Sequence, residues 1–302
     1  MNSIEKEILN LKAEKDAVIL AHYYAPAKTQ AVADYVGDSY YLAKVASSLK
    51  NRLLVFCGVG FMAESAKLLN PDKKVIVPDL TADCPMAHMA SVEKIDRMKK
   101  EIPDLAVVCY INSTAELKAV SDVCVTSSNA LKIVSRLENK NILFIPDKNL
   151  GSFVAEKIPE KNIILNDGYC PIHDSLTVSE VEKVKALHPD ALVLVHPECR
   201  QDILLLADMI GSTAEMITFA ENSDASEFII CTEEGVAFPL MMKGPKKLFY
   251  FPRDTFVCPD MKLNTPEKLL SALREEKNEI IISDKTQKAA LRPIERMLEL
   301  AK

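Results

Sequence analysis

The chain has 302 residues, of which 48% are hydrophobic and 26% charged, so it can form two or three compact domains with cores of their own. Its net charge of −6 disfavours nucleic-acid binding, because a surface that neutralises phosphates must be basic. No apolar run approaches the roughly 18 residues of a membrane span, and segment 1–16 is a charged amphipathic helix rather than a signal peptide. We therefore expect a cytoplasmic protein that contacts neither nucleic acid nor membrane.

Apolar runs and helical patterns alternate along the whole chain in three similar series. The predicted strands are, in chain order, 17–24, 53–59 and 74–79; then 105–111, 122–127, 141–147 and 162–167; then 192–198, 209–213, 228–234 and 247–251. The predicted helices between them include segments near 30–50, 61–69, 129–137 and 177–187. Continuous Val, Ile and Leu runs separated by helices are typical of parallel sheets with helices on both faces.

Several helix ends carry recognisable signals. A serine or threonine followed three residues later by glutamate is the pattern of a capping box, and it predicts helix starts at Ser113 with Glu116, Thr177 with Glu180 and Ser212 with Glu215. The tail, roughly 265–301, holds two further predicted helices. The first has Pro266 in its first turn, and the second includes the amphipathic segment 291–301.

Three Cys-Pro pairs divide the chain into nearly equal thirds. Cys84, Cys170 and Cys258 each precede a proline and lie 86 and 88 residues apart. Other landmarks keep the same period: His22, Tyr110 and His196 end apolar runs, and Ser39, Ser127 and Thr213 follow them by 17 residues. Self-similarity at a fixed period indicates repeated structural units.

We therefore predict three similar three-layer α/β/α units of the Rossmann-like type, each with a parallel sheet. Their expected bounds are 1–84, 85–170 and 171–258, with a helical tail at 259–302 that packs on the units. If the units pack around a common axis, corresponding residues converge on one central site.

Seven of the eight cysteines fall into two classes. Cys57, Cys109, Cys124 and Cys231 lie in or beside apolar strands, as small core residues do. Cys84, Cys170 and Cys258 follow strands, where open α/β sheets bind ligands. Three thiolates suit an iron–sulfur cluster, zinc or Cu(I), but a structural zinc usually has a fourth protein ligand. A [4Fe–4S] cluster held by three cysteines would keep one iron open as a Lewis acid, which favours catalysis over electron transfer.

Polar side chains cluster at the same strand ends. The predicted set comprises His22, Tyr24, Tyr110, Asn112, His196 and Glu198, and His173 lies three residues after Cys170. Ser39, Ser127, Ser212 and Thr213 lie near predicted helix starts, where N–H groups and hydroxyls bind carboxylates or phosphates. The sequence thus predicts a cavity for a substrate with more than one carboxylate or with a phosphate.

One motif favours a different ligand. Residues 58–63 read Gly-Val-Gly-Phe-Met-Ala after a strand, with Asp79 near the end of the next strand, as in a dinucleotide-binding loop. The corresponding loops of the other two units lack these glycines. Nicotinamide dinucleotide binding is therefore the alternative hypothesis for this loop.

The motifs resemble those of the quinolinate synthase family (the A protein) over essentially the whole chain. The segments that carry the resemblance are AHYY, ADYVGDSYYLA, CPMA, YINSTAELKAVSD, TSSNA, PDKNLG, GYCPIH, HPEC, GSTAEM, TEEG and CPDMK. The resemblance implies three α/β units with pseudo-threefold symmetry around a [4Fe–4S] cluster held by Cys84, Cys170 and Cys258. It also implies a transferase that condenses iminoaspartate with dihydroxyacetone phosphate to give quinolinate, phosphate and two waters.

Carried over motif by motif, the resemblance implies the roles of individual residues. The expected catalytic residues are His196, Glu198, Tyr110, His22 and Tyr24. The expected substrate-binding residues are His22, Ser39, Tyr110, Asn112, Ser127, His173, His196, Glu198, Ser212 and Thr213. One departure is visible: Asp260 stands where the family commonly has asparagine, which leaves the local hydrogen bonding open.

Iminoaspartate is labile in water, so the resemblance also implies a supplying enzyme, L-aspartate oxidase or aspartate dehydrogenase, as functional partner. Two rival functions remain open from the residues. One is an iron–sulfur hydro-lyase acting on another small carboxylate. The other is a non-enzymatic iron–sulfur redox sensor, which would not need converging His, Tyr and Glu side chains.

Overall fold

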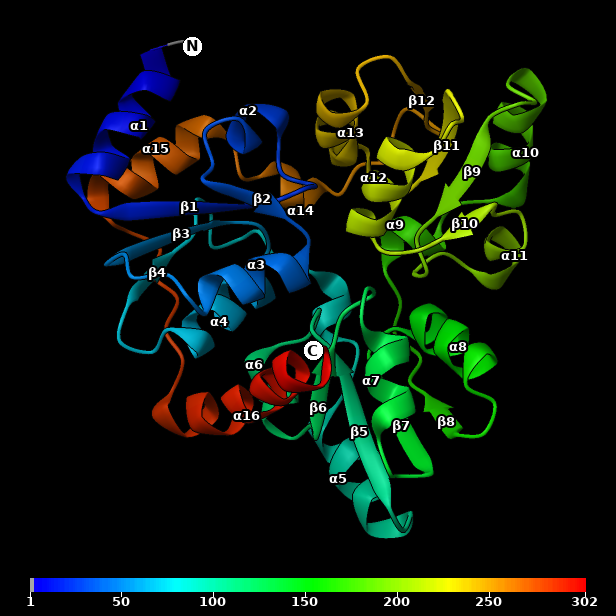
Figure 1. Cartoon of the computed structure of the whole chain (residues 1–302). Coiled ribbons are helices and arrows are strands. Elements are labelled where there is room, and N and C mark those ends of the chain that lie inside the picture. The colour runs from blue at the N-terminus through cyan, green and yellow to red at the C-terminus, as the bar shows by residue number, and fades with distance from the viewer. Residues whose placement is uncertain (1–2) are drawn as a thin grey trace.

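The computed structural model describes residues 3–302, whose strands form three separate parallel four-stranded sheets. Figure 1 shows three lobes, blue, green and yellow-green, that meet at the centre of the molecule. The strand orders are β2-β1-β3-β4, β6-β5-β7-β8 and β10-β9-β11-β12, so the same topology occurs three times. The predicted α/β class with three similar units is thereby confirmed.

The first sheet begins the chain. Its strands are β1 (Ala17–His22), β2 (Tyr35–Gly37), β3 (Leu53–Cys57) and β4 (Lys74–Ile76). Its helices are α1 (Ser3–Glu14), α2 (Ala27–Gln30), α3 (Ser39–Ala46), α4 (Gly60–Leu69) and the single-turn η1 (Pro85–His88). β1 and β3 are buried along their full length, as expected for strands covered on both faces.

The second sheet follows with the same order of elements. Its strands are β5 (Leu105–Tyr110), β6 (Val123–Val125), β7 (Asn141–Ile145) and β8 (Asn162–Leu165). Its helices are α5 (Val92–Glu101), α6 (Ala115–Ala119), α7 (Ala130–Arg136), α8 (Lys148–Lys157) and the single-turn α9 (Pro171–Asp174).

The third sheet lies between Leu192 and Tyr250. Its strands are β9 (Leu192–Val195), β10 (Met209–Ile210), β11 (Glu227–Cys231) and β12 (Leu248–Tyr250). Its helices are α10 (Val178–Leu187), α11 (Gln201–Leu204), α12 (Thr213–Asn222), η2 (Glu234–Val236), α13 (Ala237–Lys243) and the single-turn α14 (Pro259–Lys262).

One hydrogen-bond pattern shows how closely the sheets match. In each, an aspartate just before the short edge strand accepts the backbone N–H of a residue on the central strand, 15 positions earlier. The pairs are Asp34 with Ile19 (2.8 Å), Asp122 with Val107 (2.7 Å) and Asp208 with Val193 (2.7 Å). The repeat therefore extends from chain topology to single side chains.

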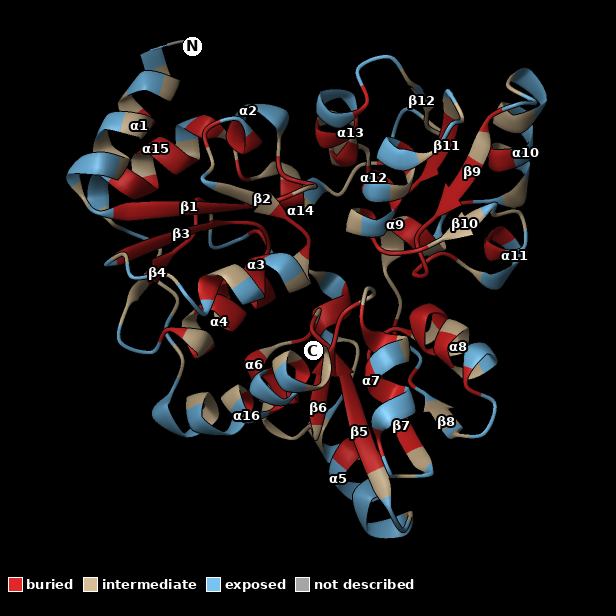
Figure 2. Cartoon of the chain, viewed as in Figure 1, coloured by how far each residue is buried: buried red, intermediate tan, exposed pale blue. Residues whose placement is uncertain are grey.

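The tail forms α15 (Pro266–Glu275) and α16 (Asp284–Leu300). α15 packs beside α1, and α16 lies against α4, α6 and α7, so it joins the first two units (Figure 1). One hydrophobic cluster of buried residues runs through the first two units and α16. The two faces of the third sheet have hydrophobic clusters of their own. Figure 2 shows the buried strands facing the covering helices, whose outer faces are exposed.

Two local predictions were wrong. Residues 30–50 were expected to be helical, but they hold the edge strand β2, and α3 begins only at Ser39. The helix expected to start with Ser113 instead has Thr114 as its N-cap, because the Thr114 hydroxyl accepts the backbone N–H of Leu117. The Ser113 hydroxyl donates to the carbonyl of Tyr110. The capping boxes at Thr177 and Ser212 are confirmed.

Within residues 3–302, every helix is too short or too polar to cross a bilayer. All eight cysteines fall in this part of the chain and are free thiols. Cys57, Cys109, Cys124 and Cys231 are buried in the sheets, as predicted.

Candidate active site

A cavity lies where the three units meet, at the carboxyl ends of their central strands. It contains about 680 Å³ of space free of protein atoms, including its opening to solvent. The polar and cysteine residues of its wall are His22, Tyr24, Asp38, Ser39, Tyr40, Cys84, Tyr110, Asn112, Thr126, Ser127, Cys170, His173, His196, Glu198, Thr213, Glu233 and Cys258. Every residue predicted for the site from sequence lies on this wall except Ser212.

Equivalent strand ends supply the first ring of side chains. His22 is the last residue of β1, Tyr110 is the last of β5, and His196 directly follows β9. His22 Nδ1 accepts the backbone N–H of Tyr24 at 3.1 Å, and His196 Nδ1 accepts that of Glu198 at 3.3 Å. A neutral imidazole that accepts at Nδ1 carries its proton on Nε2, so both rings are set as Nε2–H donors.

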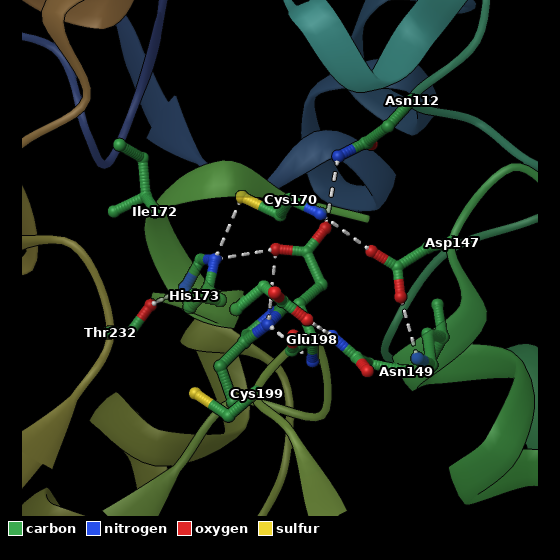
Figure 3. Close-up of polar contacts among 12 residues, drawn as sticks. Asn112, Asp147, Asn149, Cys170, Ile172, His173, Glu198, Cys199 and Thr232 are labelled. Atoms are coloured by element: carbon green, nitrogen blue, oxygen red, sulfur yellow. Dashed lines mark hydrogen bonds and ion pairs between the residues drawn. The ribbon is translucent and has the colours of Figure 1, made fainter. Parts of the chain in front are cut away.

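Glu198 is the most highly connected of these residues (Figure 3). Its Oε2 lies 2.9 Å from His173 Nδ1 and 3.4 Å from His196 Nδ1, and its Oε1 accepts a 3.4 Å hydrogen bond from Asn112 Nδ2. Burial raises the pKa of the Tyr110 phenol well above its usual value, and the charge of Glu198 raises it further. Contacts from the second and third units thus meet on one buried anion.

This arrangement fixes the charge states around Glu198. Burial alone would raise its pKa, but its neighbours, His173 foremost, outweigh burial and lower the pKa to about 2. Burial lowers the pKa of His22 and of His196 to about 3, against the opposing effect of Glu198. At neutral pH the site therefore holds an ionised Glu198 beside neutral His22 and His196.

A continuous chain of short contacts leads from Glu198 across the cavity wall. His173 Nε2 lies 2.8 Å from Thr232 Oγ1, which lies 2.6 Å from the Tyr24 hydroxyl, which in turn lies 2.7 Å from Thr213 Oγ1. Burial raises the pKa of Tyr24 well above its usual value, so its hydroxyl keeps its proton. The chain links His173, in the α9 helix that follows the second sheet, to side chains of the first and third units.

The predicted hydroxyl residues lie at three equivalent loops. Ser39 and Thr213 are the first residues of α3 and α12, and Ser127 lies in the turn before α7. Ser212 is placed differently, because its hydroxyl accepts the N–H of Glu215 as the N-cap of α12 and it borders an adjoining hollow instead. Its predicted role in substrate binding remains a prediction.

Two features of the wall point to a polar ligand. Asn112 Oδ1 is buried and has no hydrogen-bond partner, so it is a free acceptor beside the cavity. Among the described residues that line the cavity, none is lysine or arginine. An anionic ligand would therefore be held by hydroxyls, imidazoles and backbone N–H groups rather than by fixed cations.

Cys84, Cys170 and Cys258 share one geometry. Each is the residue before a single-turn helix that starts with proline, with ψ between 110° and 114°, and each lines the cavity. Burial raises the pKa of all three thiols, and Cys84 is raised further by Cys258, as Cys170 is by Glu198 and Cys84. Three free thiols from three units facing one space fit an iron–sulfur cluster, whose usual ligands are cysteines.

A smaller group could in principle hold a single metal ion. Cys170, His173 and Glu198 have ligand atoms within 4.8 Å of one another, and they offer the sulfur, nitrogen and oxygen donors that zinc accepts. These atoms already contact one another, since His173 Nδ1 lies 3.2 Å from Cys170 Sγ and 2.9 Å from Glu198 Oε2. The three side chains therefore form a hydrogen-bonded cluster among themselves.

The profile of the quinolinate synthetase A protein matches residues 6–299. The chain belongs to the quinolinate synthetase A family. It is 51% identical to the quinolinate synthase of Fusobacterium nucleatum over 99% of both chains, and 49% identical to that of Caldicellulosiruptor bescii over 98% of both. The quinolinate synthase of Clostridioides difficile is 48% identical over 98% of this chain and 97% of its own. The chain is thus a member of a family of enzymes.

The residue that departs from the quinolinate synthase pattern lies beside the third cysteine. Asp260 is in α14, two residues after Cys258, and burial raises the pKa of its carboxyl.

The glycine motif at 58–63 has a packing explanation. A Cβ at Gly58 would lie 2.8 Å from Met62 Sδ and 3.0 Å from the Phe56 ring, so a larger residue there would displace the Met62 side chain, whereas a Cβ at Gly60 would make only ordinary contacts. Phe61 and Met62 then line the same cavity as the cysteines. The motif thus contributes apolar wall to this site.

The sequence did not single out Asp38, Tyr40, Thr126, Thr232, Asp147 or Glu233. The first three lie next to predicted hydroxyl residues in the same loops. Asp147 and Glu233 follow Tyr110 and His196 by 37 residues each, a step that the repeat could have shown. Thr232 directly precedes Glu233 but has no hydroxyl equivalent in the other units, where Gly58 and Pro146 occupy its position.

Proposed function

We propose that this chain is a quinolinate synthase that condenses iminoaspartate with dihydroxyacetone phosphate, releasing phosphate and two waters. The observation that carries the proposal is the convergence of Cys84, Cys170 and Cys258 with Tyr110, His196 and Glu198 on one cavity. The family membership and the names of the relatives support the same reaction.

In this proposal, Cys84, Cys170 and Cys258 hold a [4Fe–4S] cluster in which one iron has no cysteine ligand. When bound, the cluster supplies Lewis-acid chemistry at that iron. The side chains around the cavity do the remaining work, and Met86, Ile172 and Met261, which line it near the cysteines, help to exclude water.

Substrate binding falls to the three equivalent loops. Ser39 and Thr213 open helices of 8 and 10 residues, so their hydroxyls and neighbouring N–H groups lie at the positive end of a helix dipole. Ser127 presents a third hydroxyl from the second unit. We assign these groups to the carboxylates and the phosphate, and the free Asn112 Oδ1 to a substrate donor such as the imine or amine nitrogen.

Proton transfer falls to the ring of strand-end residues. The Tyr110 hydroxyl, whose pKa is raised by burial and by Glu198, is the proton donor, and the Nε2–H of the neutral His196 polarises a substrate oxygen by hydrogen bonding. The ionised Glu198 is the proton acceptor. Tyr24 and His22 orient substrate oxygens through their O–H and Nε2–H groups, respectively.

The proposal is tested with anaerobically purified protein. We expect about four iron and four sulfide ions per chain, and quinolinate with release of phosphate from dihydroxyacetone phosphate and enzymatically generated iminoaspartate. A cluster without quinolinate formation would favour a hydro-lyase of another substrate class. Protein that holds no iron under these conditions would contradict the proposed chemistry.

The hydroxyl of Thr232 gives a further prediction. Thr232→Val removes the link between His173 and Tyr24, so we expect kcat to fall roughly tenfold to hundredfold through misorientation of both side chains, with KM changed less than about threefold. Thr232→Ser keeps the hydroxyl and is expected to recover kcat to within about threefold. Steady-state kinetics of both variants check this, and parental kcat in Thr232→Val would remove Thr232 from the orienting chain.

We also place the protein in its functional setting. Iminoaspartate hydrolyses in water, so an L-aspartate oxidase or an aspartate dehydrogenase must supply it, and a cytoplasmic location fits enzymes that share this labile compound. No contact with nucleic acid or membrane is part of the proposal.

A further inference from the structure

Each cysteine loop is held by the segment that follows the third strand of its unit in chain order. The backbone N–H of Gly60, Lys148 or Glu234 donates to the carbonyl two residues before the cysteine. The three bonds are Gly60 to Ala82 (2.9 Å), Lys148 to Gly168 (2.7 Å) and Glu234 to Phe256 (2.9 Å). This backbone clamp is therefore the same in all three units.

In two units a side chain adds a second bond to the clamp. Asp147 Oδ2 accepts the backbone N–H of Cys170 at 3.1 Å, and Glu233 Oε1 accepts that of Cys258 at 3.0 Å. Figure 3 shows Asp147 reaching toward Cys170 from the start of α8. The equivalent position in the first unit is Val59, which has no acceptor in its side chain.

Asp147 and Glu233 lie at positions where burial makes a charged side chain energetically unfavourable. Asp147 is 0% exposed and Glu233 is 1% exposed. Asp147 Oδ1 accepts the N–H of Leu150 at 2.7 Å as the N-cap of α8. Glu233 accepts the N–H of Gly235 at 2.7 Å and pairs with Lys262 at 2.8 Å. Each group is thus held in one orientation by several partners.

In the first unit a different side chain accepts the backbone N–H of the cysteine. Asp83 Oδ1 accepts the N–H of Cys84 at 2.8 Å, while Asp83 Oδ2 lies 2.6 Å from His88 Nε2. The Asp83 side chain is 52% exposed, so water can replace it as the acceptor for Cys84. The first cysteine loop therefore depends less on its carboxylate than the other two loops do.

We propose that Asp147 and Glu233 are positioning residues for the cluster ligands. Each holds the backbone N–H of a cysteine, and so fixes the direction in which the thiol enters the cavity. Without the carboxylate, a largely buried N–H would be left without a partner and the loop would be free to turn. This inference rests on the proposed function only in requiring Cys170 and Cys258 to be ligands, whichever reaction follows.

The test compares how firmly variants hold the cluster in the full chain. Asp147→Ala and Glu233→Ala, purified anaerobically, are treated with an iron chelator while the visible absorbance of the cluster is followed. We expect cluster loss at least tenfold faster than in the parent, with Asp147→Asn and Glu233→Gln intermediate because an amide oxygen can still accept one N–H. The amide variants that retain iron should also show an altered electron paramagnetic resonance spectrum after reduction.

Two controls separate positioning from general stability. Thr177→Ala removes an N-cap, as Asp147→Ala does, but on α10 away from the cysteines, and it should lose cluster at the parental rate. Asp83→Ala should stay within about twofold of the parent, because its side chain is exposed. If an alanine variant does not fold, as judged by circular dichroism, the amide variants carry the test alone.

The outcomes separate this inference from the proposed function. Parental rates of cluster loss and parental spectra in all the Asp147 and Glu233 variants would overturn the positioning role while the enzyme could still make quinolinate. Faster loss in a protein that holds a cluster but makes no quinolinate would support the inference and contradict the function. A parent without any cluster would contradict both.

Discussion

Glu198→Gln is expected to lower the rate of quinolinate formation about a thousandfold, the combined scale of lost acid–base and electrostatic catalysis. Glutamine keeps the shape of the side chain but removes the charge that Tyr110, His173 and His196 surround. Because the pKa of Glu198 is lowered to about 2, the parent carboxylate stays ionised at neutral pH and does not lose its charge until the medium is strongly acidic. The loss in the variant should therefore persist from pH 6 to pH 9.

The measurement pairs turnover with iron content. Glu198→Gln should keep the parental iron, sulfide and visible spectrum, because no cysteine ligand is changed. Glu227→Gln is the matched control, since Glu227 begins β11 at the opposite end of the same sheet and contacts Tyr250 and His188 there. Near-parental turnover in Glu198→Gln would remove Glu198 from the catalytic set.

Cys170→Ala should lose the cluster and the activity together. Alanine removes one of the three proposed ligands and, unlike serine, offers no oxygen in its place, so we expect less than about one iron per chain and no detectable quinolinate. Cys199→Ala is the matched control: Cys199 is a buried cysteine of the third unit, and its thiol faces the carbonyl of Cys231 rather than the cavity. This control should keep its iron.

The contrary result is equally clear. A full cluster in Cys170→Ala would show that Cys170 is not a ligand and would contradict the three-cysteine arrangement. Loss of iron in both variants would indicate a general sensitivity of the second and third units to cysteine substitution, and Cys84→Ala, in the first unit, would then decide between these explanations.

The repeat made most of the fold predictable. Long buried strands such as β1 and β5 are continuous apolar runs, so periodicity located them and their alternation with helices gave the parallel arrangement. β2 was missed because it is a three-residue edge strand with half-buried residues, whose place is fixed by pairing with β1 rather than by its own pattern. Asp34, in register with Asp122 and Asp208, marks this strand in the sequence.

The site was predictable only where a repeat marked it. Residues at the ends of β1, β5 and β9 recur with the period, and the topology brings them to one cavity. Thr232 was missed because its importance comes from two long-range contacts, with Tyr24 and His173, that no local pattern contains. Ser212 was expected at the cavity, yet a capping hydroxyl is used by its own helix, and sequence does not distinguish the two uses.

Covalent linkage of the three units has a consequence for the chemistry. Three separate copies of one unit would present identical groups on every wall, and each mutation would appear three times. In a single chain, equivalent positions can hold different residues. The position that follows the third strand of each unit is Val59, Asp147 or Glu233. The position at the end of the central strand is His22, Tyr110 or His196. A nearly symmetric scaffold can thereby enclose two different, asymmetric molecules and treat each end of them differently.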